Sequence, residues 1–210
     1  MSGKQQQVQQ EEAQQQEAQQ QVPRTMAQAI RCFVKQPGVL LGIAAMLSAI
    51  CLRAMHLHWG IQDTAVAAAA VCWWVLQEWV LHAKLLHSSF AWWGRSIHAK
   101  HHSRPYHHVS VDGPNVVLLI ITGGVVVSRL LLGASTLSLT ALMAFYLTAL
   151  TYEWTHFLVH THVPMHSRIS RAIKNAHLKH HLRDARYWFS FICPPLDNVM
   201  GTVPRTLHRN

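Results

Sequence analysis

The chain has 210 residues, of which half are apolar, and its formal net charge is +9 at neutral pH. This length suits one domain, and the apolar residues form long runs that are typical of helices hydrophobic on every side, as in a membrane. The Lys and Arg residues cluster beside these runs without an interleaved base-stacking surface, which argues against nucleic-acid binding. The four scattered cysteines form no CxxC pair, so we expect free thiols.

The chain begins with a Gln-rich tract, residues 1–25, that contains too few apolar side chains to form a core. We expect this tail to be disordered. It has neither the apolar segment of a secretory signal nor the Arg- and Ser-rich character of a transit peptide. The predicted division is a tail over residues 1–25 and a membrane domain over residues 26–210.

Four hydrophobic segments follow, and we predict that each crosses the membrane as a helix. The first is short for a span of about 20 residues unless flanking residues are included. A Gly-Ala-Ser-Thr turn separates the last two, so the four form two hairpins. The segments are residues 39–52, 64–81, 116–132 and 137–158.

The basic residues predict the orientation of these spans, because Lys and Arg are enriched on the cytoplasmic side of membrane proteins. All of them except Arg53 and Arg129 lie before the first span, in the central loop or in the C-terminal tail. We therefore expect both termini and the central loop to be cytoplasmic.

Ten histidines in four boxes lie at the predicted cytoplasmic ends of the spans and in the segments that follow them. Ten imidazoles would supply nitrogen ligands for two metal ions. The alternative without a metal site is a solvated basic face that happens to be rich in histidine. The boxes are His82 and His87, then His98, His101 and His102, then His156 and His160, and finally His177, His180 and His181.

The spacing within the boxes mostly favours shared ligation, because residues three and four apart lie on one face of a helix. His82 and His87 are five apart, about 140° around an ideal helix, so we expect them to reach two different metals. Glu78 precedes His82 by one turn and Glu153 precedes His156 by three residues. A ligating histidine usually donates its other N–H to such a partner, so both carboxylates are candidates to orient imidazoles.

The motifs HAKLLH, HAKHH, YEWTHFLVH and HLKHH, with the closing YWFSFICPPLDNVMGT, resemble the fatty acid hydroxylase and sterol desaturase superfamily over residues 75–204. The first box and the tail are most similar to the fatty acid 2-hydroxylases. Carotenoid hydroxylases are similar in their HxxHH boxes, but YEWTHFLVHTH departs from their third box. Thr161 also stands where the acyl 2-hydroxylases carry an adjacent histidine.

The resemblance implies an all-α integral membrane protein whose cytoplasmic helical cap holds two Fe ions through the ten box histidines. Zinc would be able to replace the iron in a purified sample. O2 would be the co-substrate, a membrane lipid the substrate, and the endoplasmic reticulum the location. The sequence contains no cytochrome b5-like HPGG motif, so we expect a separate electron donor such as cytochrome b5 with its reductase.

We therefore predict O2-dependent hydroxylation of a fatty acyl chain, at the 2-position, in a free fatty acid or a sphingolipid. A sterol or carotenoid hydroxylase or desaturase of the same superfamily is the alternative within this class. A metal-binding or metal-transporting membrane protein is the alternative of another class. Transport requires ligands within the bilayer, whereas these histidines gather at one face of the predicted membrane domain. A catalytically inactive scaffold would keep the same fold.

Overall fold

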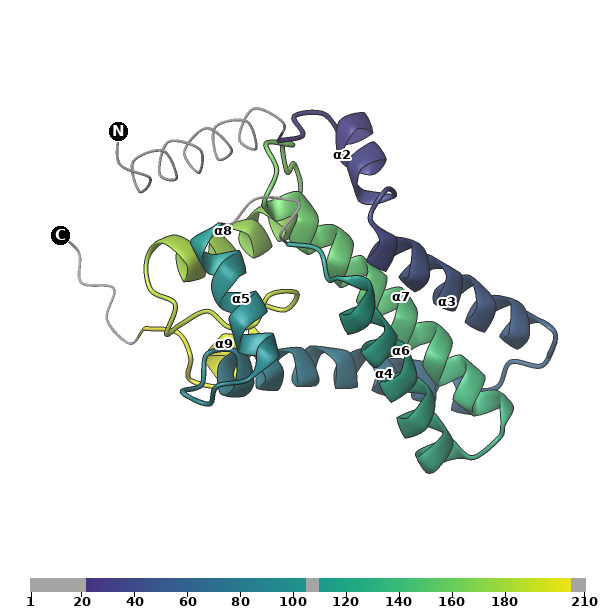
Figure 1. Cartoon of the computed structure of the whole chain (residues 1–210). Coiled ribbons are helices and arrows are strands. Elements are labelled where there is room, and N and C mark those ends of the chain that lie inside the picture. Colours follow the sequence, from purple (N-terminus) through teal and green to yellow (C-terminus); the bar gives the residue numbers. More distant parts are fainter. Residues whose placement is uncertain (1–21, 105–109, 205–210) are drawn as a thin grey trace, which may run out of the picture.

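In the computed structural model, residues 22–104 and 110–204 are described, and every regular element within them is helical. The disorder predicted for the Gln-rich tail falls, up to residue 21, outside these ranges. Four long helices form a bundle, and α5, α8 and α9 gather near one end of it (Figure 1). The helices are α2 (Met26–Phe33), α3 (Pro37–Ala54), α4 (Ile61–Val80), the π-helical η1 (Leu81–Leu86), α5 (Trp93–Ser103), α6 (Pro114–Leu132), α7 (Thr136–Val159), α8 (Arg168–Leu182) and α9 (Leu196–Val199).

Capping side chains and prolines set where the helices begin. α7 and α8 each follow a serine, Ser135 and Ser167, whose hydroxyl accepts the backbone N–H three residues further on. α3 and α6 begin at Pro37 and Pro114, where the missing N–H needs no intrahelical partner. Gly133 ends α6 with φ of 64°, a left-handed conformation that favours glycine, and this confirms the turn predicted between α6 and α7.

Within residues 22–104 and 110–204, three helical segments are long and apolar enough to cross a membrane. The helix that contains the first predicted span, α3, extends beyond the apolar segment 39–52 at both ends. It has 18 residues and is therefore about 27 Å long at 1.5 Å per residue. α7, the predicted fourth span, is not among the three and carries fully buried polar residues such as Ser138 and Thr140. A fourth crossing and a cytoplasmic cap therefore stay predictions. The three segments are Pro37–Ala54, Ile61–Leu86 and Pro114–Leu132.

A buried ion pair joins three helices at the end of the bundle opposite to the box histidines. Arg53, at the end of α3, contacts Asp63 of α4 with 2.8 Å between the guanidinium nitrogen and the carboxylate oxygen. Thr140 of α7 accepts from the Arg53 Nε–H at 2.7 Å and donates to Asp63 at 2.6 Å. A buried charge pair requires such further hydrogen bonds, because both ions have lost their hydration.

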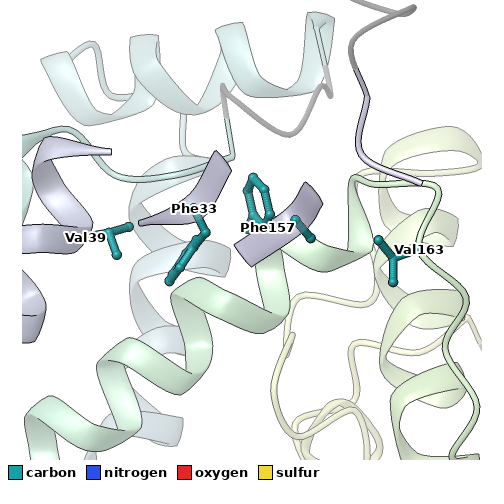
Figure 2. Packing of buried hydrophobic residues seen from close by; sticks show 5 residues of the cluster. Phe33, Val39, Phe157 and Val163 are labelled. Atoms are coloured by element: carbon teal, nitrogen blue, oxygen red, sulfur yellow. The ribbon is translucent and has the colours of Figure 1, made fainter. Parts of the chain in front are cut away.

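The short helix α2 is attached to the bundle by an aromatic cluster. Phe33 lies against Trp154 and Phe157 of α7, with ring centroids 4.9 and 5.3 Å apart. Figure 2 shows Phe33 and Phe157 in this cluster, with Val39 and Val163 on either side. The contact fixes the C-terminal end of α7, where the third histidine box lies.

Candidate metal centre

The ten box histidines converge in the structure and divide into two groups of five. Within each group, one ring nitrogen per residue lies within 4.8 Å of every other. We call these the first and the second histidine group. The first contains His82, His87, His98, His102 and His180, and the second contains His101, His156, His160, His177 and His181.

The first group joins the π-helical segment η1 to α5 and α8. The Nε2 atom of His98 lies 2.8 Å from that of His87 and 3.1 Å from that of His102. The Nε2 atom of His180 lies 3.1 Å from those of both His87 and His102. Four imidazole nitrogens, from residues up to 93 positions apart in the chain, therefore point at one small volume.

The prediction that His82 and His87 serve different metals is wrong, because both belong to the first group. The cause is the π-helical turn at Leu81–Leu86, in which the His87 N–H donates to the His82 carbonyl at 3.2 Å. A π turn brings residue i+5 over residue i, whereas an α-helix would separate the two side chains by about 140°. Single-turn π segments are frequent at functional sites.

The second group joins the end of α7 to α5 and α8. The Nε2 atom of His177 lies 3.1 Å from that of His156 and 3.0 Å from that of His160. The rings of His101 and His181 complete the group, with centroids 4.6 Å apart. His156, His160 and His177 are all buried.

Each HxxHH box supplies both groups. His98 and His102 serve the first group while His101 serves the second. In the other box the division is reversed, because His180 belongs to the first group and His177 and His181 to the second. Adjacent helical residues point about 100° apart, so one helix can face two sites that lie side by side. α5 and α8 therefore each contact both groups.

Backbone carbonyls fix the tautomers of three histidines. The Nδ1–H groups of His82, His180 and His156 donate to the carbonyls of Phe189, Tyr187 and Ser110, at 2.6, 2.7 and 2.9 Å respectively. A carbonyl only accepts, so Nδ1 of each ring carries the proton and Nε2 carries the lone pair. This is the usual arrangement for a metal-bound histidine.

Several buried ring nitrogens have no hydrogen-bond partner among the described residues. Nε2 of His82 is one of them, and both ring nitrogens of His101 and His181 are others. Unpaired buried polar atoms are rare, and a bound cation would satisfy the lone-pair nitrogen of each of these rings. The donor set also fits, because imidazole nitrogens bind iron, zinc, copper and nickel. The residues present thus suit two metal ions.

Burial and neighbouring imidazoles keep these histidines neutral. Burial, and then the neighbouring His102, lower the pKa of His98 to about 2. Burial, and then His87, lower the pKa of His102 to about 4. For His180 burial again dominates and its pKa falls to about 3, although the bond to Tyr187 opposes the shift. Neutral imidazoles are the form that binds metals.

The expectation that Glu78 and Glu153 contact the imidazoles directly is wrong. Glu78 accepts hydrogen bonds from the backbone N–H groups of Phe191 and Ile192, at 2.6 and 3.4 Å. Glu153 accepts from the backbone N–H of Asp112 at 3.2 Å. The acceptors for the Nδ1–H groups of His82 and His156 are instead carbonyls of the same two segments, although each glutamate lies three or four residues before its histidine.

Sequence reasoning missed Asp197, whose side chain is fully buried. It accepts from the N–H groups of Phe189 and Ser190, both at 3.0 Å. A single carboxylate within the mostly apolar stretch ICPPLDNVM was the available signal. Trp188, in the loop that Asp197 holds, has φ of 57°, which is unusual for a bulky residue.

A small apolar cavity of about 30 Å³ lies between α3, α6 and α7. Its walls include Val39, Ile120 and Leu150, and its polar end is formed by Asp112 and Glu153. Because Glu153 precedes His156 by less than one turn, the cavity lies beside the second histidine group.

Comparisons with known proteins agree with this arrangement. A family model described as fatty acid hydroxylase matches residues 66–202. The chain is 25% identical over 138 residues to the dihydroceramide fatty acyl 2-hydroxylase FAH1 of Arabidopsis thaliana, a match that covers 63% of the chain and 58% of the relative. The chain thus spans less than two thirds of that relative's length. Its fold is similar to the structure of full-length scs7p, in which only the hydroxylase domain is visible. That likeness has a TM-score of 0.65 at 18% identity and covers 80% of this chain and 67% of the other.

Proposed function

Because the chain belongs to the fatty acid hydroxylase family, we propose that it hydroxylates a membrane lipid at an acyl chain with O2 as co-substrate. The observation that carries the proposal is the pair of five-histidine groups beside apolar helices. Two groups of five imidazoles fit two metal ions, and the apolar helices beside them fit a substrate that lies in the membrane.

We propose that the first histidine group holds one iron ion and the second group the other. Imidazole ligands suit several metals and do not by themselves select iron. Iron is favoured because oxygen insertion into an unactivated C–H bond requires a metal that changes oxidation state. When bound, the two ions would supply the redox chemistry by which O2, two external electrons and two protons convert a C–H bond to C–OH, with the second oxygen atom leaving as water. The proposed ligands are His82, His87, His98, His102 and His180 in the first group, and His101, His156, His160, His177 and His181 in the second.

The chain's own residues bind, orient and shield in this scheme. The carbonyls of Phe189, Tyr187 and Ser110 hold the histidine Nδ1 protons and thereby aim the Nε2 lone pairs. The buried rings, with Phe191 packed on His156 and His177, exclude bulk water from the site. Apolar surface of α3, α6 and α7 would contact the acyl chain close to the second group.

The proposed substrate is an acyl chain oxidised at its 2-position, either free or in a sphingolipid. The relative described as a dihydroceramide fatty acyl 2-hydroxylase supports this choice. The electrons would come from a partner such as cytochrome b5 with its reductase. We further propose an endoplasmic reticulum location in a eukaryotic cell, with four spans and with both termini and the metal centre in the cytoplasm, as the distribution of basic residues predicts.

The test is mass spectrometry of total lipids from a host that lacks its own lipid hydroxylase. One culture expresses the chain and another the His180→Ala/His181→Ala variant, which removes one proposed ligand from each group. We expect a gain of one oxygen on an acyl chain only with the unmodified protein. His56→Ala serves as the matched control and should retain the product, because His56 belongs to neither group.

Other results would redirect the proposal. Loss of two hydrogens would identify a desaturase, and an oxidised sterol or carotenoid would change the substrate class. If iron and a donor are supplied and no lipid changes, the hydroxylase proposal is wrong. An equal product from the double variant would refute the assignment of the two groups as the catalytic metal sites.

A further inference from the structure

We propose that Glu78 and Glu153 are positioning residues that act separately, each through a backbone segment that orients one histidine group. The inference rests on the metal-binding role proposed above. Glu78 accepts two hydrogen bonds from backbone N–H groups, and Glu153 accepts one. Each glutamate would therefore act on its histidine group through a backbone segment and not by direct contact. The consequence is that each glutamate controls one metal site more than the other, although Phe191 of the loop held by Glu78 also packs on His156 and His177 of the second group.

The loop Tyr187–Ile192 serves the first group. Its carbonyls at Tyr187 and Phe189 accept from His180 and His82, which both belong to that group. One short loop thus supplies carbonyls to two proposed ligands of the same site. The position of this loop therefore decides where two of the five lone pairs point.

Two carboxylates hold that loop by four consecutive backbone N–H groups. Asp197 accepts the first two and Glu78 the next two. Four hydrogen bonds to successive backbone N–H groups leave the loop little freedom. The four donors are the N–H groups of Phe189, Ser190, Phe191 and Ile192.

A strained residue sits between the two carbonyls that face the first group. Trp188 is buried and has φ of 57°, a conformation that costs a bulky residue energy. Such strain persists only where the surroundings enforce it. Two sets of contacts hold Trp188 in this conformation. The two carboxylates bind the backbone of the next four residues, and the Trp188 N–H donates to the Thr202 carbonyl at 3.0 Å.

A different segment serves the second group. The Ser110 carbonyl accepts from His156, and two residues later the Asp112 N–H donates to Glu153. The α3 backbone lies on the other side of this segment, because a Cβ atom added at Gly38 would overlap the Asp112 carbonyl oxygen. The segment is thus held between α3 and α7, whereas the loop Tyr187–Ile192 is held by Glu78 and Asp197.

The test is a cobalt(II) titration of the purified, metal-free full chain, with absorbance reporting each site. The unmodified chain should bind two ions. His82→Ala and His156→Ala provide the reference spectra for loss of the first and the second site. Glu78→Leu should weaken the first site by about 10- to 100-fold, with the His82→Ala signature, and weaken the second site much less. Glu153→Leu should weaken the second site, with the His156→Ala signature, more than the first.

Milder variants keep the proposal testable if a leucine variant fails to fold. Asp197→Asn should reproduce the Glu78→Leu effect in smaller measure, because it loosens the same loop. Gly38→Ala should weaken only the second site, because it displaces the Asp112 segment. Glu78→Gln, which retains one acceptor oxygen, should recover part of the affinity. The control is Asp63→Asn, a buried carboxylate at the other end of α4, and it should change neither site.

Double variants test whether each glutamate acts through its assigned group. Glu78→Leu should add less than its single effect to His82→Ala, but its full effect to His156→Ala. Equal weakening of both sites by Glu78→Leu, or no change in either, overturns the inference, as does failure of the unmodified chain to bind two ions. If that chain binds two ions and makes no hydroxylated lipid, the proposed function fails while the positioning roles stand.

Discussion

Replacement of Phe191 by Ala is predicted to destabilise the protein by about 3–5 kcal/mol. The Phe191 side chain is 2% exposed and its ring lies 4.8 Å from His177 and 5.3 Å from Tyr152, measured between centroids. An aromatic side chain buries about 150–250 Å², which corresponds to about 4–6 kcal/mol at about 25 cal/mol per Å² as an upper estimate. The measured range for Phe→Ala in protein cores agrees with this magnitude.

The assay is denaturant unfolding in mild detergent, followed by tryptophan fluorescence. Phe191→Leu keeps most of the apolar volume and should cost less than about 1.5 kcal/mol. Phe90→Ala is the control, because Phe90 is 68% exposed, and it should change the free energy of unfolding by no more than about 0.5 kcal/mol. A loss below about 1 kcal/mol for Phe191→Ala would refute the view that this ring is a packed wall of the histidine centre.

Three further predictions concern the metals and the bundle. His101→Ala and His102→Ala, although adjacent in sequence, should each weaken a different metal site, and titration with Co²⁺ should give two distinct spectra. A chelator should abolish lipid hydroxylation, and Fe²⁺ should restore it while Zn²⁺ fills the sites without activity, as product analysis would show. Thr140→Val should destabilise the protein by about 1–3 kcal/mol in the same unfolding assay, because it leaves the buried Nε–H of Arg53 without its acceptor. An unchanged unfolding curve would contradict the proposed role of that ion pair.

Local patterns in the sequence determined much of this protein. Residues four apart share a helical face, so their spacing pairs His98 with His102 and His177 with His181, as the structure has them. The residues three apart, His101 and His180, fall in the opposite groups, which the spacing does not predict. Apolar runs likewise predicted the three helices that are long enough to span a membrane, and the Gly133 turn predicted the α6–α7 hairpin. These features depend on neighbours within a few residues.

The tertiary structure alone decided how the ten histidines divide between two groups. Two side chains on one helix face different sites only once another helix fixes the position of those sites. The π turn that unites His82 and His87 is likewise a small departure from α-helical geometry, and periodicity arguments assume that geometry.

The partners of the glutamates also became evident only from the fold. Sequence proximity paired Glu78 with His82 and Glu153 with His156, but two side chains on one helical face do not have to hydrogen-bond to each other. The actual acceptor for His82 is a carbonyl 107 residues away, and Glu78 reaches a segment 113 residues away. Hydrogen bonds over such separations depend on how whole elements pack. Every residue carries a backbone carbonyl, so the sequence does not indicate which carbonyl will accept a given N–H.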